Sequence, residues 1–384
     1  MASPTPPLIE GDRELEALAA RLRQERRLAF DTEAASFHRY LDRIYLMQVS
    51  SAKETALIDP LAVDELAPLA DLLEDRSIEL VFHDADYDLR ALDRDYGIHP
   101  RRLFDTRIAA QLIGEPGVGL SALLLKYFDV VLDKRWQRAD WSRRPLAPDM
   151  IAYAAADTHH LLRLRDTLEG RLRELGRHSW AEEEFTLLES VRWTQPADQD
   201  AFLALRGAKA LRPRHLAVLR QLYQWRDDVA RAQDVAPFRV LGNDALVALA
   251  TSLPTDAGGL ATVGALPATL ARRHAEPLLA AIHAGLSIPE ADWPRVERGR
   301  RPRPDPALET TIDRLKAYRT QRAAELGIEA GVLCPNGTLI AIARAAPATA
   351  AELKAVPDIK TWQVEALGSD RLLRELAPSA TPAG

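Results

Sequence analysis

The C-terminal half of the chain repeats itself at a spacing of 93 residues, and this repeat restricts the fold more than any other feature. Apolar, aromatic and turn residues recur together at this spacing: Leu219 and Ile312, Leu222 and Leu315, Trp225 and Tyr318, Arg226 and Arg319, Asn243 and Asn336, Leu246 and Leu339, Pro254 and Pro347. Both copies show helical periodicity and no strand pattern. We therefore expect two all-α helical-bundle domains, at residues 206–288 and 306–378, joined by the proline- and arginine-rich segment ADWPRVERGRRPRPDP.

The two copies differ in charge. Basic residues of the first copy correspond to uncharged or acidic residues of the second: Arg206, Lys209, Arg212, Arg214, Arg231, Arg239, Arg272 and Arg273. The formal net charge of −6 argues against a protein that coats nucleic acid with its whole surface, but it leaves room for local basic patches. We predict that the first copy contacts nucleic acid, with Arg212 and Arg214 among the contacts, and that the second is structural or contacts protein.

The N-terminal part of the chain combines strands with helices. After a first helix, the short apolar segments RLAFDTE, RIYLMQVSS and TALIDP predict adjacent strands and an antiparallel start. Helix and strand then alternate, and helices follow to about residue 175. Because 384 residues exceed what one hydrophobic core organises, several domains are expected. We predict an α/β domain with a mixed sheet at residues 1–185, before the helical domains.

Four acidic residues and one tyrosine of this domain are suited to a shared site. Asp31 and Glu33 alternate along a predicted strand, which places both on one face, where they would repel each other without a cation. An exposed strand edge with solvated acids is the alternative. In the helical stretch YAAAD, Tyr153 and Asp157 are four positions apart and share a face. Asp88, near a predicted helix start, fits as a further inward carboxylate.

The run HDADYD also resembles another kind of site, because Asp84, Asp86 and Asp88 match the opening of a calcium-binding loop. That loop needs glycine at its sixth position and glutamate at its twelfth, where this chain has Leu89 and Asp95. An apolar strand also precedes the run, where a helix would be needed. Asp84 and Asp86 are therefore expected to cap and solvate the following helix.

Other residues near these motifs have simple structural explanations. Asp105 follows an apolar pair, as Asp31 does, but capping the next helix is its simpler role. His83 directly follows a buried strand, and His159 and His160 flank the last motif on different helical faces, so we expect all three to be structural. Cys334 is the only cysteine and can form neither an internal disulfide nor a cysteine-based zinc site. It is expected to be a small core residue.

The segment KRWQRADWSRR is basic and aromatic, a composition that suits contacts to nucleic-acid phosphates with a tryptophan for base stacking. A tryptophan in such a loop is at least as often a packing anchor, and Asp140 could serve only to fix the loop. The candidate nucleic-acid contacts here are Lys134, Arg135, Arg138, Trp141, Arg143 and Arg144.

The cell compartment is indicated by what the sequence lacks. No stretch approaches the roughly 18 uncharged apolar residues of a membrane span. The N-terminus has no basic start followed by an apolar run, as a secretory signal would. A cytoplasmic protein without membrane contact is therefore expected.

Together these motifs resemble bacterial ribonuclease D, of the DEDD superfamily of 3′–5′ exonucleases, in the subgroup marked by tyrosine. The resemblance covers most of residues 28–165 and is carried by FDTEAAS, HDADYDL, FDTRIAA, GLSALLLKYFDVVLDK, QRADWSRRPL and YAAADTHHLLRL. The repeat resembles the helicase-and-ribonuclease-D C-terminal (HRDC) domain, with LRPRHLAVLRQLYQWRDDVAR carrying the match. The second copy departs most from that pattern.

The resemblance implies a ribonuclease H-like exonuclease domain that trims RNA 3′ ends and releases nucleoside 5′-monophosphates. Asp31, Glu33, Asp88 and Asp157 would hold two divalent ions, Mg²⁺ or Mn²⁺, and Tyr153 would orient the attacking water. The implied partner is RNA with a free 3′ end, such as a structured tRNA precursor, and the implied state is a monomer. A 3′–5′ DNA exonuclease and a nucleic-acid binding protein with weak nuclease activity are the alternatives, because carboxylate chemistry does not choose the sugar.

Overall fold

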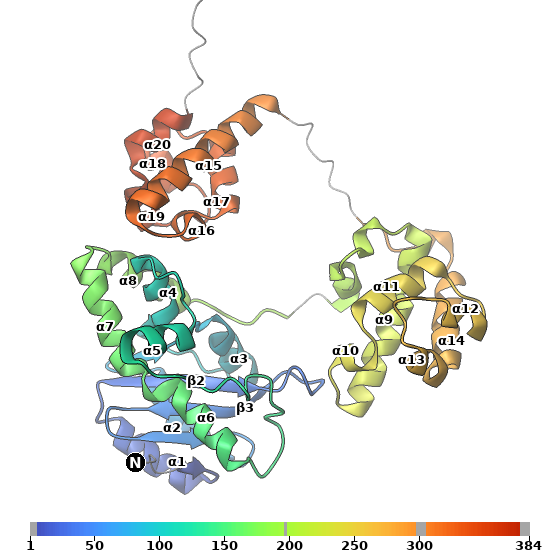
Figure 1. Cartoon of the computed structure of the whole chain (residues 1–384), viewed down its shortest axis with the longest axis horizontal. Helices are drawn as coiled ribbons and strands as arrows, with labels where there is room; N and C mark the ends of the chain where they lie inside the picture. Colours follow the sequence, from blue (N-terminus) through green and yellow to red (C-terminus); the bar gives the residue numbers. More distant parts are fainter. Residues whose placement is uncertain (1–5, 196–197, 297–304, 377–384) are drawn as a thin grey trace, which may run out of the picture.

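A mixed six-stranded sheet forms the centre of the N-terminal domain in the computed structural model, which describes residues 6–195, 198–296 and 305–376 (Figure 1). Its strands are β1 (Leu8–Ile9), β2 (Arg27–Ala34), β3 (Ile44–Ser50), β4 (Thr55–Ile58), β5 (Glu79–Phe82) and β6 (Leu103–Asp105). They lie in the order β1-β4-β3-β2-β5-β6. The β2–β3 and β3–β4 pairs are antiparallel, and the β2–β5 and β5–β6 pairs are parallel. The predicted antiparallel start and mixed sheet are therefore confirmed.

Helices cover both faces of this sheet. They are α1 (Asp12–Leu22), α2 (Ala67–Leu73), α3 (Asp86–Tyr96), α4 (Thr106–Ile113), α5 (Leu120–Phe128), α6 (Pro148–His159), α7 (Leu161–Glu174) and α8 (His178–Leu188), so the last helix continues past the predicted domain end at 185. Leu28 and Phe30 of β2 point into a core shared with α1, α2 and α3. Ala29 points to the opposite face, into a core shared with α4, α5 and α7. On that face α6 crosses β2, β3 and β4.

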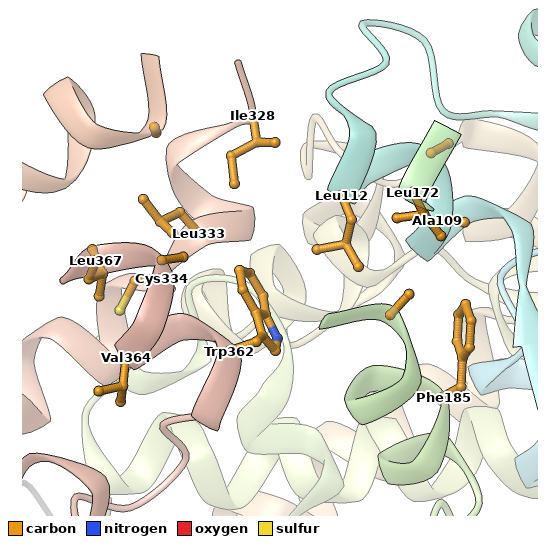
Figure 2. Packing of buried hydrophobic residues seen from close by; sticks show 14 of the residues in the cluster. Ala109, Leu112, Leu172, Phe185, Ile328, Leu333, Cys334, Trp362, Val364 and Leu367 are labelled. Atoms are coloured by element: carbon orange, nitrogen blue, oxygen red, sulfur yellow. The ribbon is translucent and has the colours of Figure 1, made fainter. Parts of the chain in front are cut away.

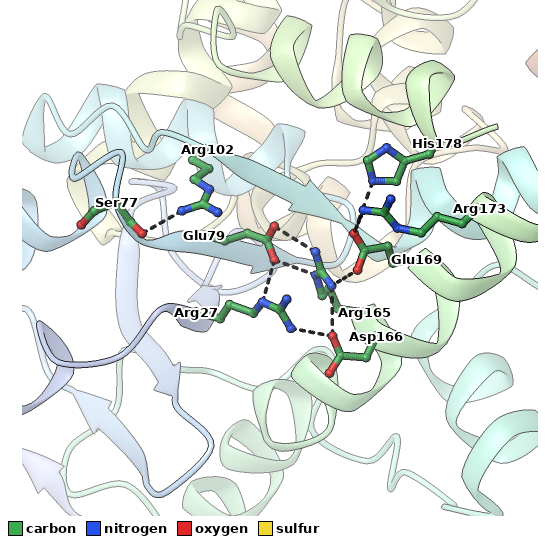
Figure 3. Close-up of polar contacts among 9 residues, drawn as sticks. All are labelled: Arg27, Ser77, Glu79, Arg102, Arg165, Asp166, Glu169, Arg173 and His178. Carbon is green, nitrogen blue, oxygen red and sulfur yellow. Dashed lines mark hydrogen bonds and ion pairs between the residues drawn. The ribbon is translucent and has the colours of Figure 1, made fainter. Parts of the chain in front are cut away.

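A buried arginine fixes α7 on the sheet (Figure 3). Arg165 is 4% exposed, and its Nη2 lies 3.0 Å from an oxygen of Glu79 in β5. The same guanidinium contacts Asp166 and Glu169 of its own helix. Arg27 of β2 joins Glu79 and Asp166 from the other side. Such a network fixes geometry more than it adds stability, and since α7 follows α6 directly, it also fixes the end of α6.

The C-terminal half of the described chain is helical, as predicted. The first copy contains the 3-10 helix η2 (Ala208–Ala210) with α9 (Pro213–Gln233), α10 (Pro237–Val240), α11 (Asn243–Ser252), α12 (Ala257–Ala261), α13 (Ala268–Arg273) and α14 (Ala275–Leu286), and it is flanked by the 3-10 helices η1 (Asp198–Ala204) and η3 (Glu290–Asp292). The second contains α15 (Pro306–Leu326), α16 (Ala330–Leu333), α17 (Asn336–Ala345), α18 (Ala350–Lys354), α19 (Thr361–Leu367) and α20 (Ser369–Leu376). Residues 297–304 of the predicted linker lie outside the described residues. Within the described ranges, no helix is long and apolar enough to cross a membrane.

The sequence repeat corresponds to a repeated buried contact. In the first copy, Arg226 of α9 donates a hydrogen bond to Oδ1 of Asn243 at 2.7 Å. In the second copy, Arg319 of α15 donates to Oδ1 of Asn336 at 2.9 Å. Arg319 also donates to the carbonyl of Cys334, whose side chain is fully buried as predicted. The matched pairs in the sequence therefore mark equivalent positions in two similar bundles.

The second helical domain shares a hydrophobic core with the N-terminal domain. Figure 2 shows Trp362 of α19 between Leu333 of its own domain and Leu112 of α4. The Trp362 ring also stacks on Trp180 of α8, with ring centroids 5.1 Å apart and an interplanar angle of 24°. Because apolar side chains from both domains pack into one core, this contact resembles a domain interior rather than a surface encounter.

Two glutamates of α8 secure the same interface. The carboxylate of Glu183 accepts hydrogen bonds from the backbone N–H groups of Thr361 and Trp362, at 2.7 and 2.8 Å. These groups open α19, where an acidic partner is favourable. Glu184 accepts from the indole N–H of Trp362 at 2.7 Å and pairs with Lys360. The second helical domain is therefore held by both apolar and charged contacts.

The first helical domain contacts the N-terminal domain differently, through the loop between β2 and β3, which reaches toward α10 in Figure 1. Tyr40 of this loop donates a hydrogen bond to Asp227 at 2.8 Å and accepts one from Arg231 at 3.0 Å. Arg239 donates to the carbonyl of Phe37 at 2.6 Å. These contacts are polar and largely exposed. Arg231 and Arg239 were counted among the basic residues of the first copy, but they bind the N-terminal domain instead.

Candidate active site

Asp31 and Glu33 of β2 and Asp157 of α6 each place a carboxylate oxygen within 4.8 Å of the others. Asp31 and Glu33 follow Ala29 at alternate positions of β2, so they leave the sheet on the face that α6 crosses. The sheet order places β2 between β3 and β5. The predicted common face is present, and the alternative of acids on an exposed strand edge does not hold.

Asp88 lies beside these three residues, in the first turn of α3, with 5% of its surface exposed. Thr32 lies between Asp31 and Glu33 in the chain. Its hydroxyl donates a hydrogen bond to the carboxylate of Asp88. Repulsion from Asp88 contributes to the raised pKa of both Asp31 and Glu33. All four predicted acids therefore belong to one electrostatic cluster.

Tyr153 lies one turn before Asp157 on α6, as predicted, and Asp157 contributes to the raised pKa of its hydroxyl. The ring packs against Trp141, with centroids 6.0 Å apart and an interplanar angle of 32°. Trp141 is 1% exposed, so no base can stack on it. The prediction of Trp141 as a nucleic-acid contact is wrong, and the residue instead supports the Tyr153 ring.

Burial raises the pKa of every carboxyl in the cluster. Burial is the largest cause, and it brings the pKa of Asp88 and of Asp157 to about 7. Burial and the neighbouring carboxylates raise the pKa values of Asp31 and Glu33 well above their ordinary values. The pKa of Tyr153 is also raised, by burial and then by Asp157. Its hydroxyl therefore stays protonated at neutral pH.

These residues fit a divalent cation. Three carboxylate oxygens meet within 4.8 Å, and oxygen is the ligand atom that Mg²⁺ and Mn²⁺ prefer. The raised pKa values of Asp31 and Glu33 indicate that ionising the cluster without a counter-charge is unfavourable. One further residue was missed in the sequence: Gln48 of β3 is fully buried on the same face. It lies in an apolar strand and carries no motif signal.

The helix-capping predictions near the site are met only in part. Asp105 accepts backbone hydrogen bonds from the first turn of α4, as predicted, and also from Ala85 at the start of α3 at 2.7 Å. The prediction that Asp84 and Asp86 cap α3 is wrong, because neither side chain makes a capping hydrogen bond there. Both instead form exposed ion pairs with arginines. One buried carboxylate thus secures both helix starts.

The histidines lie outside the carboxylate group, in agreement with their predicted structural roles. Nδ1 of His83 lies 2.9 Å from the hydroxyl of Thr106, and burial lowers the pKa of its imidazole to about 4. Nδ1 of His159 lies 3.4 Å from the hydroxyl of Thr55. His160 packs edge-on against His159. In the described part of the chain, no histidine joins the three-carboxylate group.

The basic segment divides into engaged and exposed residues. The five N–H groups of Arg144 all donate within the protein, two to the buried carboxylate of Asp59 and the others to carbonyls such as that of Tyr45. The prediction of Arg144 as a phosphate contact is therefore wrong. The remaining predicted nucleic-acid contacts are exposed and stay predictions: Lys134, Arg135, Arg138 and Arg143, with Arg212 and Arg214 of the first helical domain.

A cavity of about 300 Å³ adjoins Tyr153 and Asp157. It lies between α6 and residues 130–135, which supply the apolar Val131 and the cation Arg135. A larger cavity of about 700 Å³ continues along α6 toward the β3–β4 turn. Apolar walls with a few convergent polar groups are typical of ligand sites, so the carboxylate cluster opens into a space suited to a small charged ligand.

Two family models match the chain. A 3′–5′ exonuclease model matches residues 7–173, and the HRDC domain model matches residues 215–282 and 309–376. Ribonuclease D of Granulibacter bethesdensis is 32% identical over 374 residues, which cover 96% of this chain and 92% of that protein. This chain belongs to the ribonuclease D family. It is therefore a 3′–5′ exoribonuclease, and both helical copies are HRDC domains.

Further relatives agree over nearly the whole length. Ribonuclease D of Pseudomonas paraeruginosa is 31% identical over 370 residues, covering 95% of this chain and 96% of that protein. The crystal structure of Escherichia coli RNase D, described as an exoribonuclease involved in structured RNA processing, matches with a TM-score of 0.72 and 28% identity. That match covers 98% of this chain and 99% of the other. The similarity to ribonuclease D thus extends over nearly the whole of this chain.

Proposed function

We propose that this exoribonuclease shortens RNA from a free 3′ end by two-metal-ion hydrolysis, releases nucleoside 5′-monophosphates and acts on structured RNA such as tRNA precursors. The observation that carries the mechanism is the meeting of Asp31, Glu33 and Asp157 within 4.8 Å, with Tyr153 one turn away on α6. The proposal for structured RNA is supported by the related Escherichia coli enzyme, which is described as acting in structured RNA processing.

The four acids would hold the cations. Asp31, Glu33 and Asp157 supply oxygens to a common point, and Asp88 adds charge from α3. When bound, Mg²⁺ or Mn²⁺ supplies positive charge that lowers the pKa of the attacking water and stabilises charge on the phosphate oxygens. The sheet and the fixed position of α6 keep these side chains in place before substrate arrives, which reduces the cost of orienting the reactants.

Tyr153 would orient the attacking water. Burial and the surrounding carboxylates raise the pKa of its hydroxyl, so the group remains protonated and acts as a hydrogen-bond partner rather than as a base. Its ring packs against the buried Trp141, which leaves the side chain little freedom. A fixed hydroxyl beside the cluster can hold a water in line with the scissile phosphorus.

The mechanism is tested with labelled RNA and DNA that carry free or blocked 3′ ends, in Mg²⁺, Mn²⁺ or chelator, for the wild type and Asp31→Asn. We expect stepwise shortening of RNA with a free 3′ end, only with metal and only by the wild type. Shortening in chelator, or by Asp31→Asn at the wild-type rate, would refute the metal mechanism. Equal or faster shortening of DNA would instead favour a DNA exonuclease.

The same assay addresses the substrate and the state of the enzyme. A tRNA precursor with a 3′ trailer should be shortened to the edge of its acceptor stem, and shortening of unstructured RNA alone would contradict the proposal for tRNA precursors. Monomeric state and cytoplasmic location, both expected from the sequence, stay predictions. Sedimentation at assay concentration tests the first of these.

A further inference from the structure

Gln48 lies at the centre of β3, directly opposite Asp31 in the antiparallel ladder with β2. Residues opposite each other in such a ladder project from the same face of the sheet. The neighbours of Gln48 agree with this direction, because Leu46 packs with residues of α6, whereas Met47 and Val49 belong to the core on the other face. The Gln48 side chain therefore lies under α6, on the face that carries the acids.

Gln48 is fully buried, and within the described chain neither atom of its side-chain amide has a hydrogen-bond partner. Buried polar groups are paired in the large majority of cases, because an unpaired amide has lost its contacts with water without replacement. A methionine or leucine of similar volume would avoid this cost. The amide of Gln48 is therefore unfavourable for the stability of the fold itself.

Another buried glutamine shows the ordinary arrangement. Gln363 in α19 is 1% exposed, and its Oε1 accepts a hydrogen bond from the backbone N–H of Lys360 at 3.1 Å. This bond helps to close the start of the helix. The two glutamines are equally buried, but only Gln363 has a structural partner, which makes it a matched control for Gln48.

The acids around Gln48 offer what its amide lacks. Cβ atoms of directly opposite residues lie about 4.5–5.5 Å apart, which puts the Gln48 amide within reach of the Asp31 carboxylate. An ionised carboxylate accepts hydrogen bonds, and the amide NH₂ has two to donate.

We propose that Gln48 is a positioning residue of the metal site, whose side-chain amide donates to the Asp31 carboxylate and holds it in the orientation that binds the cation. This inference rests on the proposed function, because it needs a divalent-ion site at the acids. Hydrogen bonds of this kind to a ligating carboxylate typically change metal affinity by about 10- to 100-fold.

The test compares Gln48→Met and Gln363→Met in the full chain, with Gln48→Leu as a second variant. Thermal unfolding is measured in EDTA, and Mn²⁺ binding by calorimetry without RNA. For Gln48→Met we expect the melting temperature in EDTA to rise by about 2–8 °C and Mn²⁺ binding to weaken about tenfold or more. For Gln363→Met we expect a lower melting temperature and unchanged Mn²⁺ binding.

Opposite changes in stability and metal affinity identify a positioning role, because loss of a structural residue would lower both. Unchanged Mn²⁺ affinity in the two Gln48 variants would overturn the inference while leaving the metal mechanism intact. A lower melting temperature in both would show that Gln48 is needed for folding, which also overturns it. If the wild type itself bound no Mn²⁺, the proposed function would fail first, and the inference with it.

Discussion

Replacing Asp88 with asparagine should stabilise the metal-free protein while removing its activity. The carboxyl is 5% exposed, and burial raises its pKa from 3.8 to about 7. Above pH 7 the folded chain carries a buried charge that the unfolded chain exposes to water. At about 1.4 kcal/mol per pH unit, the penalty reaches about 4 kcal/mol at pH 8. Asparagine fits the same space and keeps an oxygen that can accept from Thr32.

The pH dependence separates this charge effect from other effects of the substitution. Between pH 3.8 and about 7 the folded state binds more protons at Asp88 than the unfolded state, so the free energy of unfolding falls as the pH rises. At pH 5 only about 2 kcal/mol of the penalty has developed. Measured by denaturant unfolding in EDTA, the gain from Asp88→Asn should be about 2–3 kcal/mol larger at pH 8 than at pH 5. A gain that does not depend on pH would refute the reasoning.

Asp105→Asn is the matched control. Asp105 is 1% exposed, but its carboxylate accepts hydrogen bonds from four backbone N–H groups. Asparagine has a single acceptor oxygen, so this variant should lose about 1–2 kcal/mol at pH 5. Burial also raises the pKa of Asp105, so removal of its charge should make this loss smaller at pH 8. If Asp105→Asn gained stability, or Asp88→Asn lost it at pH 8, hydrogen bonding rather than charge repulsion would control the behaviour of these carboxyls.

Three further outcomes are expected. Tyr153→Phe should lower kcat about 10- to 100-fold, because the attacking water loses the hydroxyl that orients it. The Mn²⁺ affinity measured by calorimetry should not change. A loss of Mn²⁺ affinity would instead make Tyr153 part of the metal site. Replacing Arg212 and Arg214 with glutamate should weaken RNA binding in a filter assay at least tenfold. Lys354→Glu in the second helical domain should have little effect on RNA binding. Equal effects would contradict the prediction that only the first helical domain contacts RNA. Glu184→Gln should lower the unfolding temperature by about 2–6 °C, because Lys360 loses its charged partner, and an unchanged temperature would show that apolar packing alone holds that domain.

The positions of Asp31, Glu33, Tyr153 and Asp157 were predictable from the sequence because each depends on local periodicity. Alternation along one strand places Asp31 and Glu33 on a common face, and a four-residue spacing on one helix brings Tyr153 next to Asp157. Both periods hold whatever the tertiary structure is. Only the meeting of strand and helix depended on the fold, and the resemblance to a known family supplied that.

The loop residues were harder to predict because their environment is set by distant parts of the chain. Arg144 looks like its exposed neighbours in sequence, yet its partner Asp59 lies 85 positions away. Trp141 is buried against Tyr153 by the same loop. Composition gives the charge and the aromatic character of such a segment, but it does not give which side chains turn inward. Gln48 was missed for the complementary reason, since a polar residue inside an apolar strand carries no local signal.

The two helical copies contact the catalytic domain in different ways. The second copy packs Trp362 into a core shared with the catalytic domain, and Glu183 and Glu184 receive its α19. Part of its surface is thus buried against protein. A basic side chain there would be desolvated without contacting a phosphate. The first copy contacts the loop that leaves β2 after Glu33, through polar groups and the ring pair of Phe37 and Phe238. RNA binding by the first copy stays a prediction, which the exposed Arg212 and Arg214 carry.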